Sequence, residues 1–202
     1  DKNSTCHLDP DFRLGAIGQI KQSQKHLKNR GVSINDLFLF FGWFKETWNI
    51  EGKIVFKNNT KYPDGFHLIF GYLEIDDIIH TSNQNTPLWL RNHCHYTRES
   101  VRMDKSNAIY VGKRKSLLRQ NQAGFGILPF SEKRILTKEG RPRSHWDINK
   151  LKELKSLSIS YHAKESWGNN YFQSAGRGQE FVIEENERAE DWALGMLTED
   201  SA

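Results

Sequence analysis

The sequence has little cysteine and no long apolar run. Its two cysteines, Cys6 and Cys94, are too few for a disulfide framework or a four-cysteine zinc site. The longest apolar run, Leu37 to Phe44, is about half of the roughly 18 residues that span a bilayer. We therefore expect an intracellular, cytoplasmic protein with no membrane partner.

The sequence does not begin with methionine, and no signal peptide is expected from its first residues. It begins with Asp1, and no basic segment followed by an apolar one lies near that residue. We interpret the chain as a fragment, and we expect an N-terminal part of the full protein to be missing.

Aromatic residues are plentiful in a chain that is otherwise polar. The 12 Phe, 6 Tyr and 6 Trp residues can supply a core although the mean hydropathy is −0.72. Wholesale disorder is therefore not expected. A length of 202 residues predicts one domain.

Charge is distributed unevenly along the chain, although the net charge is only +4. Residues 91–119 contain eight basic and two acidic residues, and residues 133–155 contain eight and three. Residues 179–202 contain eight acidic residues and one arginine. The segregation predicts a surface for a polyanion. The alternative is two solvated basic loops and a solvated acidic helix.

Hydrophobic periodicity predicts an α+β fold. Apolar residues at helical spacing predict a helix over Leu14–Asn29. The continuous apolar segment Asp36–Phe44 predicts a strand buried on both faces. Phe66–Ile79 predicts a second long strand, with a bulge or bend at Gly71. Shorter strands are expected at Ile54–Phe56, Asn107–Val111, Gly126–Phe130, Lys133–Leu136 and Glu180–Glu184, and helices at Ile148–Leu154 and Arg188–Leu197. This order suits a small antiparallel sheet or β-barrel with flanking helices.

The two long strands resemble a known strand pair. Asp36–Phe44 (DLFLFFGWF) followed by Phe66–Ile75 (FHLIFGYLEI) is similar to a pair found in PUA-like barrels, including the EVE, ASCH and YTH groups. The resemblance implies a PUA-like barrel that binds RNA or a modified base.

A second resemblance covers nearly the whole chain. The segments that carry it are His7–Asp11 (HLDPD), the two long strands, Trp89 with His93 and His95, and Gln179–Val182 (QEFV). Together they resemble the nucleotide modification associated domain family, third class. The resemblance implies a single domain over residues 1–202 that serves phage or bacterial systems handling modified DNA bases. The family also has an Arg-Lys-Gly-Phe-Asp motif, which this sequence lacks.

The segment His7-x-Asp9-x-Asp11 is a candidate catalytic or metal site. In an extended chain, alternate residues point to one side, so the imidazole and both carboxylates could converge on a divalent cation such as Mg²⁺ or Mn²⁺. The competing interpretation is that Asp11 caps the following helix. The sequence favours the cap.

His93, His95 and Tyr96 form a second candidate site. The two imidazoles would share one side of a strand and, with His7 or an acidic residue, could bind zinc or iron. Their basic neighbours fit a phosphate or a base edge better. An ordinary loop is the alternative. The candidate phosphate-binding residues are Arg91, Arg98, Arg102, Lys113, Arg114 and Lys115.

Three tryptophans and one glycine-flanked loop are further candidates for binding a base or a nucleotide. Trp43, Trp89 and Trp167 could stack on a base, although most tryptophans in a small domain belong to the core. In residues 174–180, Arg177 could contact a phosphate, Gln179 could read a base edge and Glu180 could act as a general base. A flexible loop without function is the alternative.

Three functions are consistent with these features. The first is recognition or processing of a modified base in DNA or a nucleotide, in an aromatic pocket beside a basic surface. The second is a metal-dependent enzyme of base modification. The third is a subunit that docks a protein partner through its acidic C-terminal helix.

Overall fold

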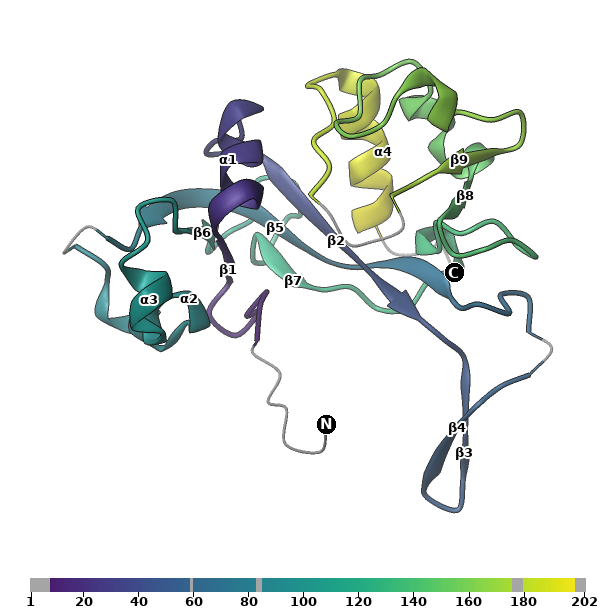
Figure 1. Cartoon of the computed structure of the whole chain (residues 1–202), viewed down its shortest axis with the longest axis horizontal. Coiled ribbons are helices and arrows are strands. Elements are labelled where there is room, and N and C mark those ends of the chain that lie inside the picture. Colours follow the sequence, from purple (N-terminus) through teal and green to yellow (C-terminus); the bar gives the residue numbers. More distant parts are fainter. Residues whose placement is uncertain (1–7, 59, 83–84, 176–179, 199–202) are drawn as a thin grey trace. The chain divides into compact units, whose positions relative to one another are not determined.

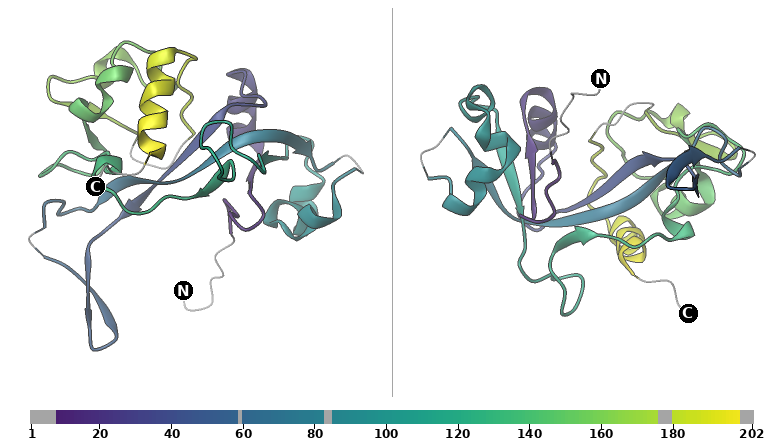
Figure 2. Two further views of the ribbon diagram at one scale, coloured as in Figure 1. Left: turned by 180° about the vertical axis from the view of Figure 1, so that it is seen from behind. Right: turned by 90° about the horizontal axis from the view of Figure 1, so that it is seen from below.

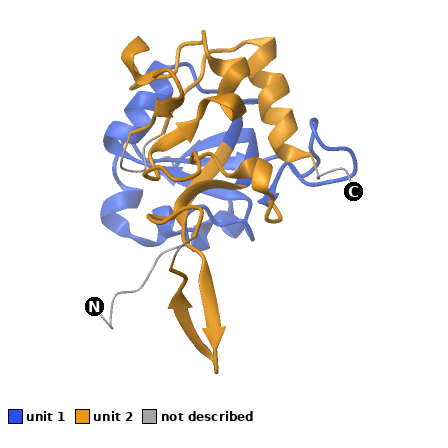
Figure 3. Ribbon diagram, turned by 90° about the vertical axis from the view of Figure 1, so that its right-hand side faces the viewer, with its two compact units in different colours: residues 1–38, 71–127 blue, residues 39–70, 128–202 orange. Residues whose placement is uncertain are grey.

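The computed structural model describes residues 8–58, 60–82, 85–175 and 180–198. The chain divides into two compact units, each built from two separate parts of the sequence (Figure 3). The first unit comprises Asp1–Phe38 and Gly71–Ile127, and the second comprises Leu39–Phe70 and Leu128–Ala202.

The elements of each unit can be followed along the chain in Figure 1. Two long strands contribute to both units, namely β2 (Leu37–Phe44) and β5 (Phe66–His80). The first unit also contains β1 (Ala16–Gln19), α1 (Lys21–Asn29), the 3-10 helix η1 (Leu88–Asn92), α2 (Cys94–Thr97), α3 (Glu99–Arg102), β6 (Ala108–Gly112) and β7 (Phe125–Ile127). The second contains β3 (Thr47–Ile50), β4 (Lys53–Phe56), η2 (Glu132–Arg134), β8 (His145–Asp147), η3 (Ile148–Leu154), η4 (Lys164–Ser166), β9 (Tyr171–Gln173) and α4 (Glu187–Leu197).

The main sheet is small and antiparallel. Its strands follow the order β1-β6-β5-β2, and β7 also pairs with β5. Ala16 lies opposite Val111 in the β1–β6 pair, and Tyr72 lies opposite Gly126 in the β5–β7 pair. The predicted α+β class with a small antiparallel sheet is confirmed.

The core of the first unit lies against β1 and β6. Every residue of β6 is buried, and Ile109 and Val111 pack with Ala16 and Leu90. Leu90 comes from η1, so burying it fixes the start of the η1–α2–α3 segment against the sheet. The short helices α2 and α3 lie together beside β1 (Figure 1; Figure 2).

The bulge in β5 is not at the glycine where we expected it. The register shifts between Ile75 and Asp77 instead. A Cβ on Gly71 would lie 2.5 Å from the ring of Phe12, so the glycine serves a close contact with that ring. Of the two expected features at Gly71, the bulge is wrong, and the bend stays a prediction.

The second unit is organised around aromatic side chains. Phe41 lies within 5.3 Å of the rings of His67 and Trp146, measured between centroids, and stacks on Phe181 at 5.7 Å. Trp146 donates its Nε1–H to His67 Nδ1 at 2.9 Å. The β3–β4 hairpin and the β8–β9 pair belong to this unit.

The expected start of the first helix and the expected burial of the first long strand are both wrong. The helix begins at Lys21, because residues 12–15 form a turn and β1 follows. Gly15 in this stretch has a φ of +66°, which a helix interior does not permit. The strand β2 is at most half-buried, and it ends the order of the sheet, with a paired neighbour on one side.

Two expected strands are also absent from the described residues. The segment Lys133–Leu136 contains part of η2 and one isolated bridge, from Ile135 to Leu68. The segment Glu180–Glu184 has a single isolated bridge, from Ile183 to Ile159. Within the described ranges, no helix has the length and apolar character needed to cross a membrane.

Candidate functional site

Asp9 lies opposite two histidines in the first unit. Its Oδ2 is 3.2 Å from His95 Nε2, and its Oδ1 is 3.7 Å from His93 Nε2. The backbone N–H of Gly18, in β1, donates to Oδ1 at 3.0 Å. The structure therefore brings together parts of two candidate sites that are more than eighty residues apart in the sequence.

Asn107 fixes the orientation of the His95 ring through the ring nitrogen that does not face Asp9. Its Nδ1 lies 2.7 Å from Asn107 Oδ1, and the Asn107 amide nitrogen donates to Thr81 Oγ1 and to the carbonyl of His95. Thr81 in turn donates to the carbonyl of Arg102 at 2.8 Å. Because both amide protons have acceptors, the Asn107 oxygen must face the ring, so Nδ1 carries a proton and Nε2 faces Asp9.

His93 begins the helix α2 and is fully buried. Its Nδ1 accepts the backbone N–H of His95 at 3.2 Å, which is the N-cap contact of α2. Its Nε2 has no hydrogen-bond partner among the described residues. The expectation that His93 and His95 share one side of a strand is wrong, because the capped helix turn orients both rings.

Burial and hydrogen bonding shift the pKa values of His93 and His95 in opposite directions. Burial lowers the pKa of His93. For His95 burial acts in the same direction, but the hydrogen bonds to Asp9 and Asn107 outweigh it and raise the pKa. Burial raises the pKa of the Cys94 thiol to about 11. The Cys94 Sγ lies 3.5 Å from the carbonyl of Leu8.

Asp11 makes a turn rather than a helix cap. Its Oδ1 accepts the backbone N–H groups of Arg13 and Leu14, and the Arg13 guanidinium pairs with it at 3.2 Å. Burial opposes the charge of Asp11, but the bonds from Arg13 and Leu14 lower its pKa. The capping contacts favoured by the sequence are present, but a turn and β1 follow them in place of a helix. His7 lies outside the described residues.

Aromatic rings and guanidinium groups pair on the surface of the same unit. Trp89 is 39% exposed, and the Arg114 guanidinium carbon lies 5.4 Å from its ring centroid. The guanidinium carbons of Arg91 and Arg102 lie 5.9 and 5.1 Å from the ring centroid of Tyr96. We call this the η1–α3 surface, defined by Trp89, Arg91, Tyr96, Arg98, Arg102, Lys113, Arg114 and Lys115.

Two cations of the η1–α3 surface have acidic neighbours. Lys113 Nζ lies 3.7 Å from Asp76, and an Arg102 guanidinium nitrogen lies 3.9 Å from Glu99. Both distances are long for ion pairs, and the acidic partners are exposed. Such pairs contribute little to stability. The Arg102 side chain is 31% exposed and can reach an anionic ligand, whereas the Lys113 side chain is only 13% exposed.

One family model matches nearly the whole chain. The family whose model matches residues 1–184 is described as "Nucleotide modification associated domain 3". The chain belongs to this family. Neither the curated proteins nor the solved structures include a match to the chain.

The remaining candidates belong to the second unit of this nucleotide modification associated domain. Trp43 is 56% exposed, donates to the carbonyl of Asp64 and has the Arg143 guanidinium over its ring at 5.1 Å. Trp167 packs on Phe172 with a centroid distance of 4.6 Å. Glu180 is half-buried, and Arg177 and Gln179 lie outside the described residues.

The basic stretch of this unit is partly structural. Arg134 is 2% exposed and donates to the carbonyls of Pro129, Met196 and Thr198. Lys150 donates to the carbonyls of Glu132 and Ile135. Arg134 and Lys150 are thus bonded within the protein, and only the other basic residues of 133–155 remain candidates for contact with a polyanion.

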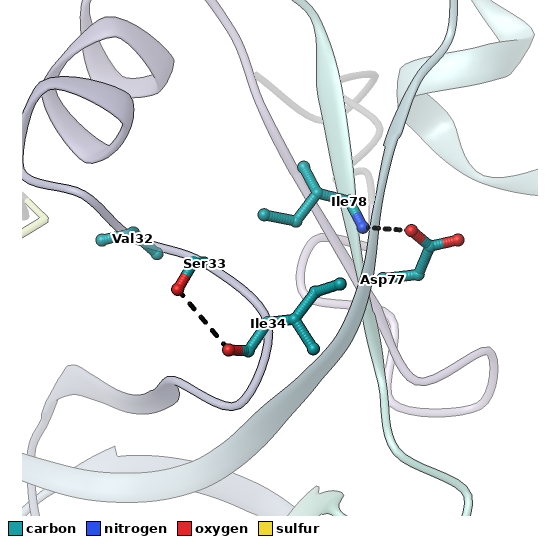
Figure 4. A pocket seen from close by; sticks show the side chains of 5 residues that line it. All are labelled: Val32, Ser33, Ile34, Asp77 and Ile78. Atoms are coloured by element: carbon teal, nitrogen blue, oxygen red, sulfur yellow. Dashed lines mark hydrogen bonds between the residues drawn. The ribbon is translucent and has the colours of Figure 1, made fainter.

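A shallow hollow of the first unit has no aromatic side chain in its lining. It is lined by Val32, Ser33, Ile34, Asp77 and Ile78 (Figure 4). Asp77 accepts the backbone N–H of Ile78, and the Ser33 hydroxyl contacts the carbonyl of Ile34. With one carboxylate and no ring in its lining, this hollow does not provide the expected aromatic pocket.

Sequence reasoning missed the residues that support the Asp9 cluster. Asn107, Thr81 and Gly18 act through hydrogen bonds or close contact with His95 and Asp9, and no local motif marks them. Glu74, a buried carboxylate in β5, was also missed. It accepts the backbone N–H of Leu117 at 2.9 Å and the hydroxyl of Ser116.

Proposed function

We propose that the chain binds DNA or a nucleotide that carries a modified base, and that the η1–α3 surface is the binding surface. The family supports the setting, because its description associates it with nucleotide modification. The observation that carries the proposal is the pairing of guanidinium groups with two aromatic rings: Arg91 and Arg102 lie over the half-buried Tyr96, and Arg114, from the segment after β6, lies over the exposed Trp89.

Both parts of a nucleotide have suitable partners on this surface. A guanidinium group donates two parallel hydrogen bonds to a phosphate, and Arg91, Arg98 and Arg114 are exposed. Stacking of a base on an aromatic face contributes about 1–3 kcal/mol. Trp89 and Tyr96 can provide such faces, and a guanidinium over a ring can itself stack on a base.

The salt dependence of binding tests this proposal. We would measure the affinity for an oligonucleotide at several salt concentrations with the chain and with the variant Arg91→Gln/Arg102→Gln/Arg114→Gln. Each lost phosphate contact reduces the slope of log K against log salt by about 0.9 for duplex DNA and about 0.7 for single strands.

The matched control is Lys25→Gln/Lys28→Gln/Arg30→Gln, which removes the same number of charges from exposed positions of α1 and its C-cap in the same unit. The proposal requires a large loss of affinity and a smaller salt slope in the arginine variant, with a small change in the control. Equal losses in both variants would indicate nonspecific attraction to net charge and would contradict the assigned surface.

An enzyme of base modification is the second candidate function. The observation that favours it is the pair of Asp9 and His95, held by Asn107 and placed in a largely water-excluded cluster. Such a pair can hold and transfer a proton. Asp9→Asn and His95→Gln would then abolish turnover of a nucleotide while leaving oligonucleotide binding intact. Unchanged turnover in both variants would contradict catalysis at this pair.

A further inference from the structure

Asp9 lies close to potential metal ligands other than His95, its hydrogen-bonding partner. A carboxylate, an imidazole and a thiol converge there from two segments of the first unit, namely Asp9, His93 and Cys94. We infer that these three residues form a binding site for a divalent transition metal of the zinc type, with His95 as an outer residue that orients the Asp9 carboxylate.

The separations of the donor atoms fit one ion. One donor atom from each of the three residues lies within 4.8 Å of the other two. Asp9 Oδ1 and His93 Nε2 are 3.7 Å apart. Zinc bonds to oxygen and nitrogen of about 2.0–2.2 Å place two tetrahedral ligands about 3.4 Å apart. Small side-chain movements would therefore bring all three onto a single ion.

The ring of His93 supplies an independent observation. It is fully buried, and its Nε2 faces the Asp9 carboxylate. The Ala16 backbone also acts on this ring, but no hydrogen bond of ordinary geometry reaches Nε2 among the described residues. Buried polar atoms are nearly always satisfied, so an unpaired one needs an explanation. A cation between Nε2 and the carboxylate would satisfy it.

The surroundings of the carboxylate match the outer shell of a metal site. Ligating carboxylates are usually hydrogen-bonded through groups behind them. Asp9 receives the backbone N–H of Gly18 on Oδ1 and faces His95 Nε2 with Oδ2. Asn107 in turn holds His95, so the direction of the carboxylate is set by two further residues.

Two features must change when an ion binds. Cys94 has to lose its thiol proton, which a coordinated metal removes outright. His93 has to move its proton to Nδ1, which breaks the 3.2 Å bond from the His95 backbone. One neutral hydrogen bond is a small fraction of the free energy of a zinc site, so coordination outweighs its loss, and it releases the thiol proton of Cys94.

The donor set also selects the ion. A thiolate and an imidazole are ligands for zinc and similar transition metals, whereas Mg²⁺ and Ca²⁺ prefer oxygen. This differs from the Mg²⁺ or Mn²⁺ that His7, Asp9 and Asp11 suggest from the sequence. Three protein ligands leave the fourth position of a tetrahedral ion for water or a substrate.

Direct metal binding tests the inference with the full chain carrying no affinity tag. After equilibration with Zn²⁺ and removal of free ions, elemental analysis should find one zinc per chain. Co²⁺ should produce tetrahedral absorption with a thiolate-to-cobalt charge-transfer band, which Cys94→Ser removes. Asp9→Asn and His93→Gln should each weaken Zn²⁺ binding at least about tenfold, and His95→Gln about 10–100-fold.

The control variant is His80→Gln, which removes an exposed histidine of the same unit and should leave Zn²⁺ binding unchanged. Circular dichroism establishes that each variant is folded. A chain that retains no zinc, or that binds it equally well after Asp9→Asn and His93→Gln, would overturn the inference.

A second measurement avoids disruptive variants altogether. In a Cys6→Ser background, Zn²⁺ should slow alkylation of Cys94 at least tenfold, whereas Mg²⁺ should not. An alkylation rate that Zn²⁺ does not change would overturn the inference even if the substitutions at Asp9 and His93 prevent folding. Metal binding and oligonucleotide binding are measured separately, so either proposal can fail alone.

Discussion

His95 Nδ1 lies 2.7 Å from Asn107 Oδ1, and this contact determines which ring nitrogen faces Asp9. The Asn107 amide is held by Thr81 and by the carbonyl of His95, so its oxygen cannot turn away without leaving both donors unpaired. A residue at the start of a strand thus fixes the chemistry of a histidine on a short helix.

Removing the Asn107 side chain should loosen this arrangement. Asn107→Ala deletes three hydrogen bonds of a fully buried side chain, so we expect the free energy of unfolding to fall by about 1–3 kcal/mol. Urea unfolding measures the loss, and nitrogen chemical shifts of the His95 ring report which of its nitrogens carry protons. Asn29→Ala, at an exposed position of α1, is the control and should change neither quantity. Unchanged chemical shifts of both ring nitrogens in Asn107→Ala would contradict this role.

Gly18 should not tolerate a larger side chain. A Cβ at this position would overlap the His95 ring, so Gly18→Ala must displace the ring or the strand β1. We expect a destabilisation of about 1–3 kcal/mol together with a changed environment of His95 in its NMR spectrum. Gly195→Ala, in α4, meets nothing within 4 Å and should be neutral or slightly stabilising. A Gly18→Ala chain as stable as the native one would show that the contact is relaxed in solution.

The second unit should lose stability in acid through His67. Burial and the charge of Arg143 lower the pKa of His67 from 6.5 to about 4, so the folded chain holds this ring neutral. The stabilising contribution is complete above pH 6.5 and is lost as the pH falls toward 4. A shift of that size corresponds to about 3 kcal/mol.

The measurement is urea unfolding at pH 7 and at pH 4.5. In His67→Gln the loss of unfolding free energy between these pH values should be smaller than in the native chain. His80→Gln changes an exposed histidine and should leave the acid-induced loss as it is. The same pH dependence in all three chains would refute the assignment to His67.

Arg134 should be essential for stability rather than for binding. It is buried and donates to three carbonyls, two of them at the end of α4 and just after it. Arg134→Met should lower the free energy of unfolding by about 3–5 kcal/mol, because charged hydrogen bonds are lost and carbonyls are left unpaired. Arg141→Met removes an exposed arginine from the same stretch and should cost less than about 0.5 kcal/mol. A comparable loss of unfolding free energy in both variants would mean that the change in net charge, and not the buried hydrogen bonds of Arg134, causes the loss.

The long strands and the C-terminal helix were predictable because their patterns are local. β2, β5 and α4 lie within about one residue of their expected ends. The helix expected from Leu14 failed because the spacing of Leu14, Ile17 and Ile20 also fits a turn followed by a strand. There the conformation of Gly15 and the pairing of β1 with β6 decide the outcome, and neither can be derived from periodicity.

The sequence identified most residues of the candidate site, but it could not show which of them meet in space. Asp9, His93 and His95 were identified from their neighbours, but their meeting depends on how the N-terminal segment and α2 pack on β1. Asn107 carries no sequence signal, because a single asparagine before a strand is ordinary. The loop at Arg177 and Gln179 and the residue His7 stay predictions.

The most direct test of the central claim is the affinity of the chain for matched oligonucleotides and free nucleotides, with canonical and modified bases, at two salt concentrations. We predict tighter binding to a modified base, with a preference that persists at high salt, because stacking on Trp89 or Tyr96 does not depend on counterion release. Arg91→Gln/Arg102→Gln/Arg114→Gln should weaken binding of both forms. No binding at either salt concentration would contradict the account.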